Sequence, residues 1–95
     1  MGCVTRKKQP WEKLPYSMEF VRRIPSGESL DAVSSIEPDP DDGTITITSK
    51  SVSGTKALCV IDGGTDGSTY KIEFRVTTTP SGYQLEDDGT LAVAD

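Results

Sequence analysis

The sequence contains no histidine, only two cysteines and no long hydrophobic run. Histidine is the commonest general base and the commonest metal ligand, so its absence argues against the usual catalytic triads and most metal centres. Two cysteines cannot build a structural zinc site or a disulfide framework. Without about 18 consecutive apolar residues, no segment is expected to span a membrane. We therefore expect no enzyme activity, no cofactor, no bound metal and no membrane partner.

The chain has 95 residues, 34% of them hydrophobic, which suits one small domain with a thin two-layer core. Its formal net charge of −5 is unevenly placed. Residues 1–23 carry six basic and two acidic side chains, whereas residues 24–95 carry four basic and thirteen acidic ones. An acidic body disfavours binding to nucleic acid. The basic start is either a solvated tail or a surface that contacts an acidic partner, nucleic acid or the acidic body of a neighbouring copy.

Residues 1–14 are predicted to form a flexible basic arm, and residues 15–95 are predicted to form the folded domain. Pro10 and Pro15 prevent a regular helix at the start and favour extended structure.

The only tryptophan, Trp11, allows two readings. It either folds back over the end of the domain and becomes buried, or it anchors the protein in a partner's pocket. The second reading is supported by the preceding basic residues, since tryptophan beside basic groups suits interfaces. We therefore take Trp11, Arg6, Lys7 and Lys8 as the candidate partner contacts.

Period-2 alternation predicts an antiparallel strand at 69–79, with Tyr70, Ile72, Phe74 and Val76 on its buried face. The same reasoning predicts further strands at 16–21, 44–48, 57–61 and 90–94.

Residues 28–37 are ambiguous, because Leu30, Val33 and Ile36 recur near helical spacing. Turn signals on both sides favour a strand, with Leu30, Ala32 and Ser34 on one face.

Glycine-rich segments separate these strands. Gly63, Gly64, Asp66 and Gly67 are predicted to form a structural turn, since a phosphate cradle would need a helix after it. Glu86-Asp87-Asp88-Gly89 is predicted to form another turn. The acidic groups at Asp39, Asp41 and Asp42, at Asp62 and Asp66, and in this last turn are weighed as calcium ligands, and turn formation explains them better.

Cys59 lies in an apolar run and is expected to be buried, whereas Cys3 falls within the arm.

Six to seven strands at this spacing, with no helix, indicate an all-β chain, a single antiparallel immunoglobulin-like β-sandwich. The Cys…Trp…Cys pattern of true immunoglobulin domains is absent. A small β-barrel is the alternative, because strand spacing alone does not separate the two.

The chain also resembles a family of small tailed-phage and prophage proteins. The resemblance rests mainly on 63–72, Gly-Gly-Thr-Asp-Gly-Ser-Thr-Tyr-Lys-Ile, followed by Val76-Thr77-Thr78, Ser81–Glu86 and Leu91-Ala92-Val93. The opening Lys8–Lys13, with Tyr16, Phe20 and Gly27–Leu30, is similar as well. The family is similar to immunoglobulin-like sandwiches, and its genes tend to lie among head and tail genes.

The resemblance implies a non-enzymatic virion structural or assembly protein, in the head–tail region or as a fibre-like or decoration module. Its partners would be phage structural proteins, with self-association a further option, and it would reside in the virion, or in the host cytoplasm before assembly. The edge near 44–48 or the basic arm would dock onto repeated subunits. A carbohydrate- or cell-surface-binding module is the alternative, and it would need an exposed aromatic platform from Tyr16, Tyr70 and Tyr83.

Overall fold

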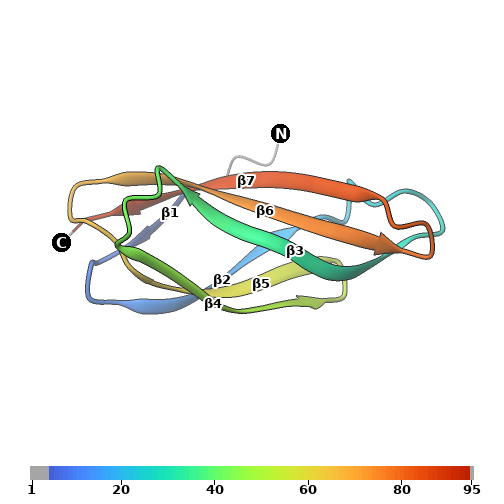
Figure 1. The fold of residues 1–95 in the computed structure, drawn as a ribbon, viewed down its shortest axis with the longest axis horizontal. Helices are drawn as coiled ribbons and strands as arrows, with labels where there is room; N and C mark the ends of the chain where they lie inside the picture. The colour runs from blue at the N-terminus through green and yellow to red at the C-terminus, as the bar shows by residue number, and fades with distance from the viewer. Residues whose placement is uncertain (1–4, 95) are drawn as a thin grey trace.

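The computed structural model describes residues 5–94, which form seven β-strands and no helix (Figure 1). The strands are β1 (Thr5–Lys8), β2 (Lys13–Glu19), β3 (Ser29–Asp39), β4 (Ile45–Ser53), β5 (Lys56–Gly63), β6 (Thr69–Thr79) and β7 (Gln84–Val93). The prediction of an all-β chain is confirmed.

The strands form two open sheets that face each other across one core (Figure 1). One sheet has the order β1-β7-β6-β3, and the other has the order β2-β5-β4. All neighbouring strands are antiparallel except β1 and β7, which run parallel. Because neither sheet closes on itself, the alternative of a closed barrel is wrong.

The core comes from the inward faces that alternation predicted. Tyr70, Ile72, Phe74 and Val76 of β6 are all buried, as expected. Phe20, just after β2, and residues from the other strands complete the layer between the sheets; the latter include Met18, Ile36, Ala57, Cys59, Ile61, Leu91 and Val93. The long strands β6 and β7 pair in regular register from Thr69–Ala92 to Thr77–Gln84, and they form the centre of the larger sheet.

Strand β3 exists where it was predicted, but its predicted face is wrong. Leu30 and Ile36 are buried and Val33 is half-buried, whereas Ala32 and Ser34 are exposed. The register against β6 shifts twice, once between Leu30 and Ala32 and once between Val33 and Ser35. Each shift adds a residue and turns the strand, so a spacing of three replaces a spacing of two. Two β-bulges therefore produce the helix-like pattern.

The predicted turn at 86–89 is also wrong, since these residues lie within β7. Their backbone pairs with β6, and Asp87 is the register partner of the buried Phe74. Pairing with β6 over nine residues, Gln84 to Ala92, outweighs the local turn preference of an Asp-Gly pair. As a consequence Asp87 points inward, where it is 7% exposed and forms an ion pair with Arg23 at 3.4 Å.

The described part of the predicted arm, residues 5–14, contains β1 and the start of β2. Its four-residue strand pairs with the end of β7, from Thr5–Thr90 to Lys8–Val93. This short basic strand is held by its pairing with β7 and contributes no apolar residue to the core, so hydrophobic alternation does not reveal it.

The molecule is elongated, 43 Å along its longest axis, and its loops gather at the two ends (Figure 1). The β1–β2 turn, the β3–β4 loop and the β5–β6 connection lie at the left end in Figure 1. The β2–β3 loop and the β6–β7 turn lie at the right end.

Candidate functional site

Trp11 stands on a tight turn between β1 and β2. The Glu12 amide donates to the Gln9 carbonyl at 3.0 Å, and the Gln9 amide donates to the Glu12 carboxylate at 2.7 Å. Pro10 occupies the second turn position, which suits its fixed φ. The Trp11 side chain is 91% exposed, so the prediction that it folds back and becomes buried is wrong. The turn holds its backbone while the indole projects into solvent.

Lys8 fixes this turn to the opposite sheet. Although it was predicted as a partner contact, it is only 3% exposed. Its ammonium donates to the carbonyl oxygens of Gln9, at 2.6 Å, and of Gly63 at the end of β5. Burial lowers the pKa of Lys8, and the nearby acidic groups, Asp62 first, oppose this effect. Lys8 is therefore a positioning residue for the turn and is not available to a partner.

Arg6 and Lys7 are exposed and lie on different sides of β1. Arg6 pairs in register with the buried Leu91 and lines a cavity between the sheets. Lys7 pairs with Ala92 and lies on the outer side, beside Trp11's turn. The predicted group of four contact residues thus reduces to Trp11 and Lys7 at the turn, with Arg6 facing elsewhere.

The β5–β6 connection lies beside this turn and has little steric freedom. Gly63 ends β5 with φ +85°, and a Cβ there would lie 2.1 Å from the Thr44 carbonyl oxygen. Gly64, Asp66 and Gly67 form the connection itself. The Gly67 amide donates to the Val93 carbonyl at 2.7 Å, which ties the connection to the end of β7.

Tyr70 and Asp42 join three segments at this end of the molecule. The buried Tyr70 hydroxyl donates to the Asp42 carboxylate at 2.7 Å and accepts from the Thr65 amide at 2.8 Å. Asp42 also accepts from the Thr44 hydroxyl at 2.6 Å and from the Thr44 amide at 3.0 Å. The Thr44 groups first, and then the Tyr70 hydroxyl, lower the pKa of Asp42 to about 2. This network stiffens the loops that surround Trp11's turn.

The opposite end carries two exposed hydrophobic side chains, Val21 and Tyr83. Glu28 joins the loops there, since its carboxylate accepts from the Thr78 hydroxyl at 2.9 Å and from the Ser81 amide at 3.1 Å. These bonds contribute to a lowered pKa of Glu28, against a larger opposing desolvation.

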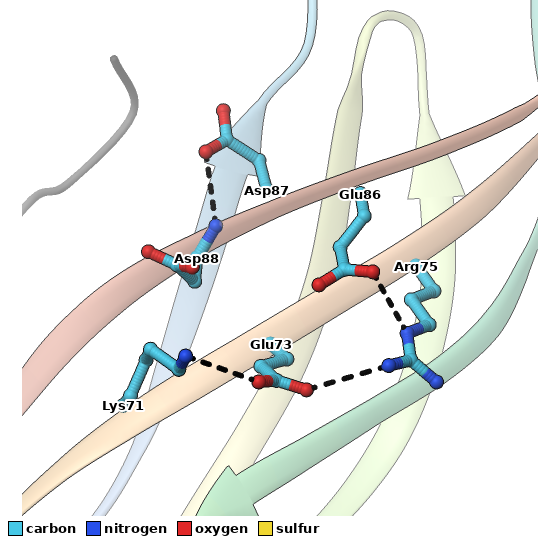
Figure 2. A network of polar contacts seen from close by, with 6 residues as sticks. All are labelled: Lys71, Glu73, Arg75, Glu86, Asp87 and Asp88. Atoms are coloured by element: carbon cyan, nitrogen blue, oxygen red, sulfur yellow. Dashed lines mark hydrogen bonds and ion pairs between the residues drawn. The ribbon is translucent and has the colours of Figure 1, made fainter.

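The outer face of β6 and β7 is covered by charged side chains (Figure 2). Arg75 pairs with Glu86 at 3.1 Å and with Glu73 at 3.6 Å, and Lys71 pairs with Glu73 at 3.3 Å. Asp88 takes part in none of the ion pairs found among residues 5–94. Exposed pairs of this kind contribute little, about 0–1 kcal/mol each, so these ion pairs do not account for the stability of the sheet.

Cys59 is buried, as predicted, and burial raises its pKa to about 11, whereas Cys3 lies outside the described residues. Within residues 5–94, no group of three or more acidic or cysteine side chains is arranged to hold a metal ion. No helix in the described chain could cross a membrane.

A carbohydrate platform would need clustered exposed aromatic rings. Tyr70 is fully buried and Tyr16 is half-buried on the inward side of β2. Tyr83 is exposed, but its turn lies at the opposite end of the molecule from Trp11's turn (Figure 1). The three tyrosines therefore do not form the platform that the alternative function requires.

A protein-family model described as podophage GP4 fiber-tail adaptor protein gp77 matches residues 8–93. The chain belongs to this family. The match covers nearly all of the sequence, and it confirms the resemblance to phage structural proteins. No curated protein matches the chain significantly.

Sequence reasoning named Tyr16 as a strand and platform residue and Asp87 as a turn residue, but it did not predict the unpartnered hydroxyl of the first or the inward side chain of the second. The Tyr16 hydroxyl is the buried side-chain polar atom, among the described residues, that has no hydrogen-bond partner. Burial raises the pKa of Tyr16. Asp87 was hidden by the apparent turn signal, and only its place opposite Phe74 reveals that it points inward. Alternation at 16–21 places Tyr16 on the same face as Met18 and Phe20, but no sequence pattern shows that its hydroxyl lacks a partner or that Asp87 points inward.

Proposed function

We propose that the protein is a non-enzymatic virion component that joins a phage fibre to the tail through protein–protein contacts. The family match supports this function, since the family is described as a fibre–tail adaptor. Such a protein needs preorganised surfaces and no reactive group. It would reside in the virion, after a period in the host cytoplasm before assembly.

The exposed Trp11 is the observation that carries the proposal. Buried tryptophan anchors dominate many interfaces, yet here the indole is 91% exposed. Its turn is already held by Glu12, Gln9 and Lys8, so little ordering entropy is lost when a partner covers it. Lys7 beside it favours an acidic rim on that partner.

We propose an immunoglobulin-like topology for this adaptor. Strands three, six and seven form one sheet and strands two, five and four the other, as in immunoglobulin domains, while the first strand joins β7. Tyr70 gives independent support. It lies near the start of the sixth strand, and its hydroxyl bonds the backbone of Thr65 upstream, like the tyrosine corner of that fold.

Binding to the tail and fibre proteins encoded with this chain tests the function. The recombinant proteins would be mixed pairwise and analysed by size-exclusion chromatography with light scattering, and affinities measured by calorimetry. Trp11→Ala should weaken one of the complexes about 30-fold or more, the loss expected for an interface anchor. Tyr83→Ala is the matched control, another exposed aromatic at the far end, and it should leave that complex unchanged. No complex with any tail or fibre protein would refute the adaptor function.

A further inference from the structure

Within residues 5–94, the outer edge of the long strand β7 is paired over only part of its length. Strand β6 pairs with β7 from Gln84 to Ala92, whereas β1 covers only Thr90–Val93 on the other side. Among residues 5–94, no strand pairs with the outer edge of β7 at residues 84–89. The larger sheet therefore ends in a step, with β1 occupying only one part of the edge position.

The other free edges of the two sheets are interrupted. Pro15 removes an amide from β2, two bulges break β3, and the register of β4 shifts between Thr48 and Ser51, where Ser49 has φ +54°. Such devices prevent edge pairing. The register of β7 against β6 shows no shift, and residues 84–89 contain no proline. This edge is thus the one best suited to accept a strand.

One backbone group at this edge is occupied by a side chain. The Asp88 amide donates to the carboxylate of its neighbour Asp87 at 2.9 Å, in place of a strand partner. Arg23 holds that same carboxylate from the β2–β3 loop. An inward charge at a sheet edge discourages pairing with other strands. A partner strand that pairs here must displace the Asp87 carboxylate from the Asp88 amide.

A small cavity opens next to the step, between β2 and β7. It measures about 30 Å³, and its lining includes the apolar side chains of Met18, Ile61 and Leu91 together with Tyr16 and Arg6. A space of this size takes one small group. Tyr16, whose buried hydroxyl has no hydrogen-bond partner among the described residues, belongs to this lining. The cavity thus offers a mostly apolar socket with one unused polar group beside the open edge.

We propose that the open edge of β7, Gln84–Gly89, receives an extended segment of a partner protein as an additional strand in line with β1, and that a small side chain of this segment enters the cavity lined by Tyr16. Strand addition of this type uses main-chain hydrogen bonds for affinity and side-chain pockets for specificity. A threonine or serine suits the socket, since its methyl or methylene packs against the apolar lining while its hydroxyl bonds Tyr16.

Charge defines the rest of the partner segment. The outer face beside the edge carries Glu86 and Asp88, of which Glu86 is already paired with Arg75 (Figure 2). Among residues 5–94 Asp88 forms no ion pair, although its charge acts on nearby Lys71, so a lysine or arginine of the incoming segment fits opposite it. The segment is therefore extended, alternates in polarity and carries at least one basic residue. This proposal rests on the adaptor function, because the segment is assigned to a tail or fibre protein.

The probes are 12-residue peptides tiled across the tail and fibre proteins encoded with this chain. Binding would be measured by fluorescence anisotropy, and the site located by amide hydrogen exchange. At least one peptide should bind, slow exchange within residues 84–89, and carry a basic residue. Tyr16→Phe should weaken its binding about tenfold, the loss of one hydrogen bond, without lowering the melting temperature.

Asp88→Pro is the decisive variant, because it removes an amide that faces the edge and does not serve the pairing with β6. It should abolish peptide binding, whereas Asp88→Asn, which keeps the amide, should weaken it only a few-fold. If Asp88→Pro does not fold, Asp88→Lys replaces it and should weaken binding of the basic peptide at least tenfold. The proposal is wrong if no peptide slows exchange at 84–89, or if bound peptides protect only the turn of Trp11. Complexes of intact proteins that depend on Trp11 would still form in that case, which separates failure here from failure of the adaptor function.

Discussion

Tyr70→Phe tests whether the hydrogen-bond network between the loops stabilises the fold. The substitution keeps the buried ring and removes a hydroxyl that bonds Asp42, Thr65 and Thr44, at 2.7, 2.8 and 3.2 Å. Removing a buried hydroxyl with its hydrogen bonds costs about 1–3 kcal/mol. Asp42 and Thr65 are exposed and regain water, so we expect a loss of about 2 kcal/mol and not the sum of three bonds.

In a domain of this size, a loss of about 2 kcal/mol lowers the melting temperature by about 8–16 °C. Unfolding in urea should be followed by far-UV circular dichroism, since the exposed Trp11 already resides in water and reports little. Tyr83→Phe is the control, because its ring is exposed, and it should unfold like the unaltered protein. A Tyr70→Phe variant that unfolds within 0.5 kcal/mol of the control, about the scatter of surface changes, would refute the role given to the hydroxyl.

The same substitution should change the response to acid. The pKa of Asp42 is lowered to about 2, so the ionised carboxylate stabilises the folded state above its unfolded pKa of 3.8. That contribution is lost as the pH falls from about 4 towards about 2. Without the Tyr70 hydroxyl the pKa lies closer to its ordinary value, and the loss should be shallower. Identical acid curves for the two proteins would mean that Tyr70 does not hold Asp42.

Three further predictions concern buried or constrained positions. Gly63→Ala should destabilise the fold by more than about 3 kcal/mol, because strain at positive φ adds to the overlap of the new Cβ with the Thr44 carbonyl. Gly67→Ala is the control: its φ is similar but the space around it is open, so it should cost about 1–2 kcal/mol. Equal losses of stability in urea unfolding would contradict the steric argument. In a Cys3→Ser background, Cys59 should react with a thiol reagent only on unfolding, since burial raises its pKa to about 11, and fast labelling of the native protein would contradict this. Lys8→Met should cost about 1–3 kcal/mol and weaken tail or fibre binding through Trp11, because the Gly63 and Gln9 carbonyls lose their donor; unchanged exchange of the Glu12 amide would show that Lys8 does not hold the turn.

Much of this fold is predictable from the sequence because alternation reports burial directly. The strands at 44–48, 57–61 and 69–79 follow from it; the last two lie within β5 and β6, and the first overlaps β4, which begins one residue later at Ile45. Alternation fails where the backbone departs from a regular strand. In β3, two bulges convert the spacing of the buried Leu30, Val33 and Ile36 to three, which no period-2 template detects. In β7, long-range pairing overrides the turn preference of Asp88-Gly89.

The candidate site is less predictable, since exposure depends on tertiary contacts. Trp11 was selected because it is the only tryptophan, and Arg6, Lys7 and Lys8 were selected because basic residues beside a tryptophan are typical of interfaces. Only the structure separates Lys8, which is drawn inward by the Gly63 carbonyl, from the exposed Lys7 one position earlier. Successive side chains of β1 point to opposite faces of the sheet, so the adjacent lysines differ: Lys8 bonds the Gly63 carbonyl and Lys7 is exposed.

The open edge of β7 raises the question why copies of the protein would not simply pair with one another. Two such edges meeting would bring Glu86, Asp87 and Asp88 of both copies together, and like charges opposite each other in a sheet are destabilising. Displacing the Asp87 carboxylate from the Asp88 amide would add a second cost to both copies. A basic partner segment is not repelled by the acidic edge. It must still displace the Asp87 carboxylate from the Asp88 amide, and its positive charge offsets that cost. In the strand addition that we propose, the acidic run thus disfavours pairing between two copies of the protein and favours a segment of opposite charge.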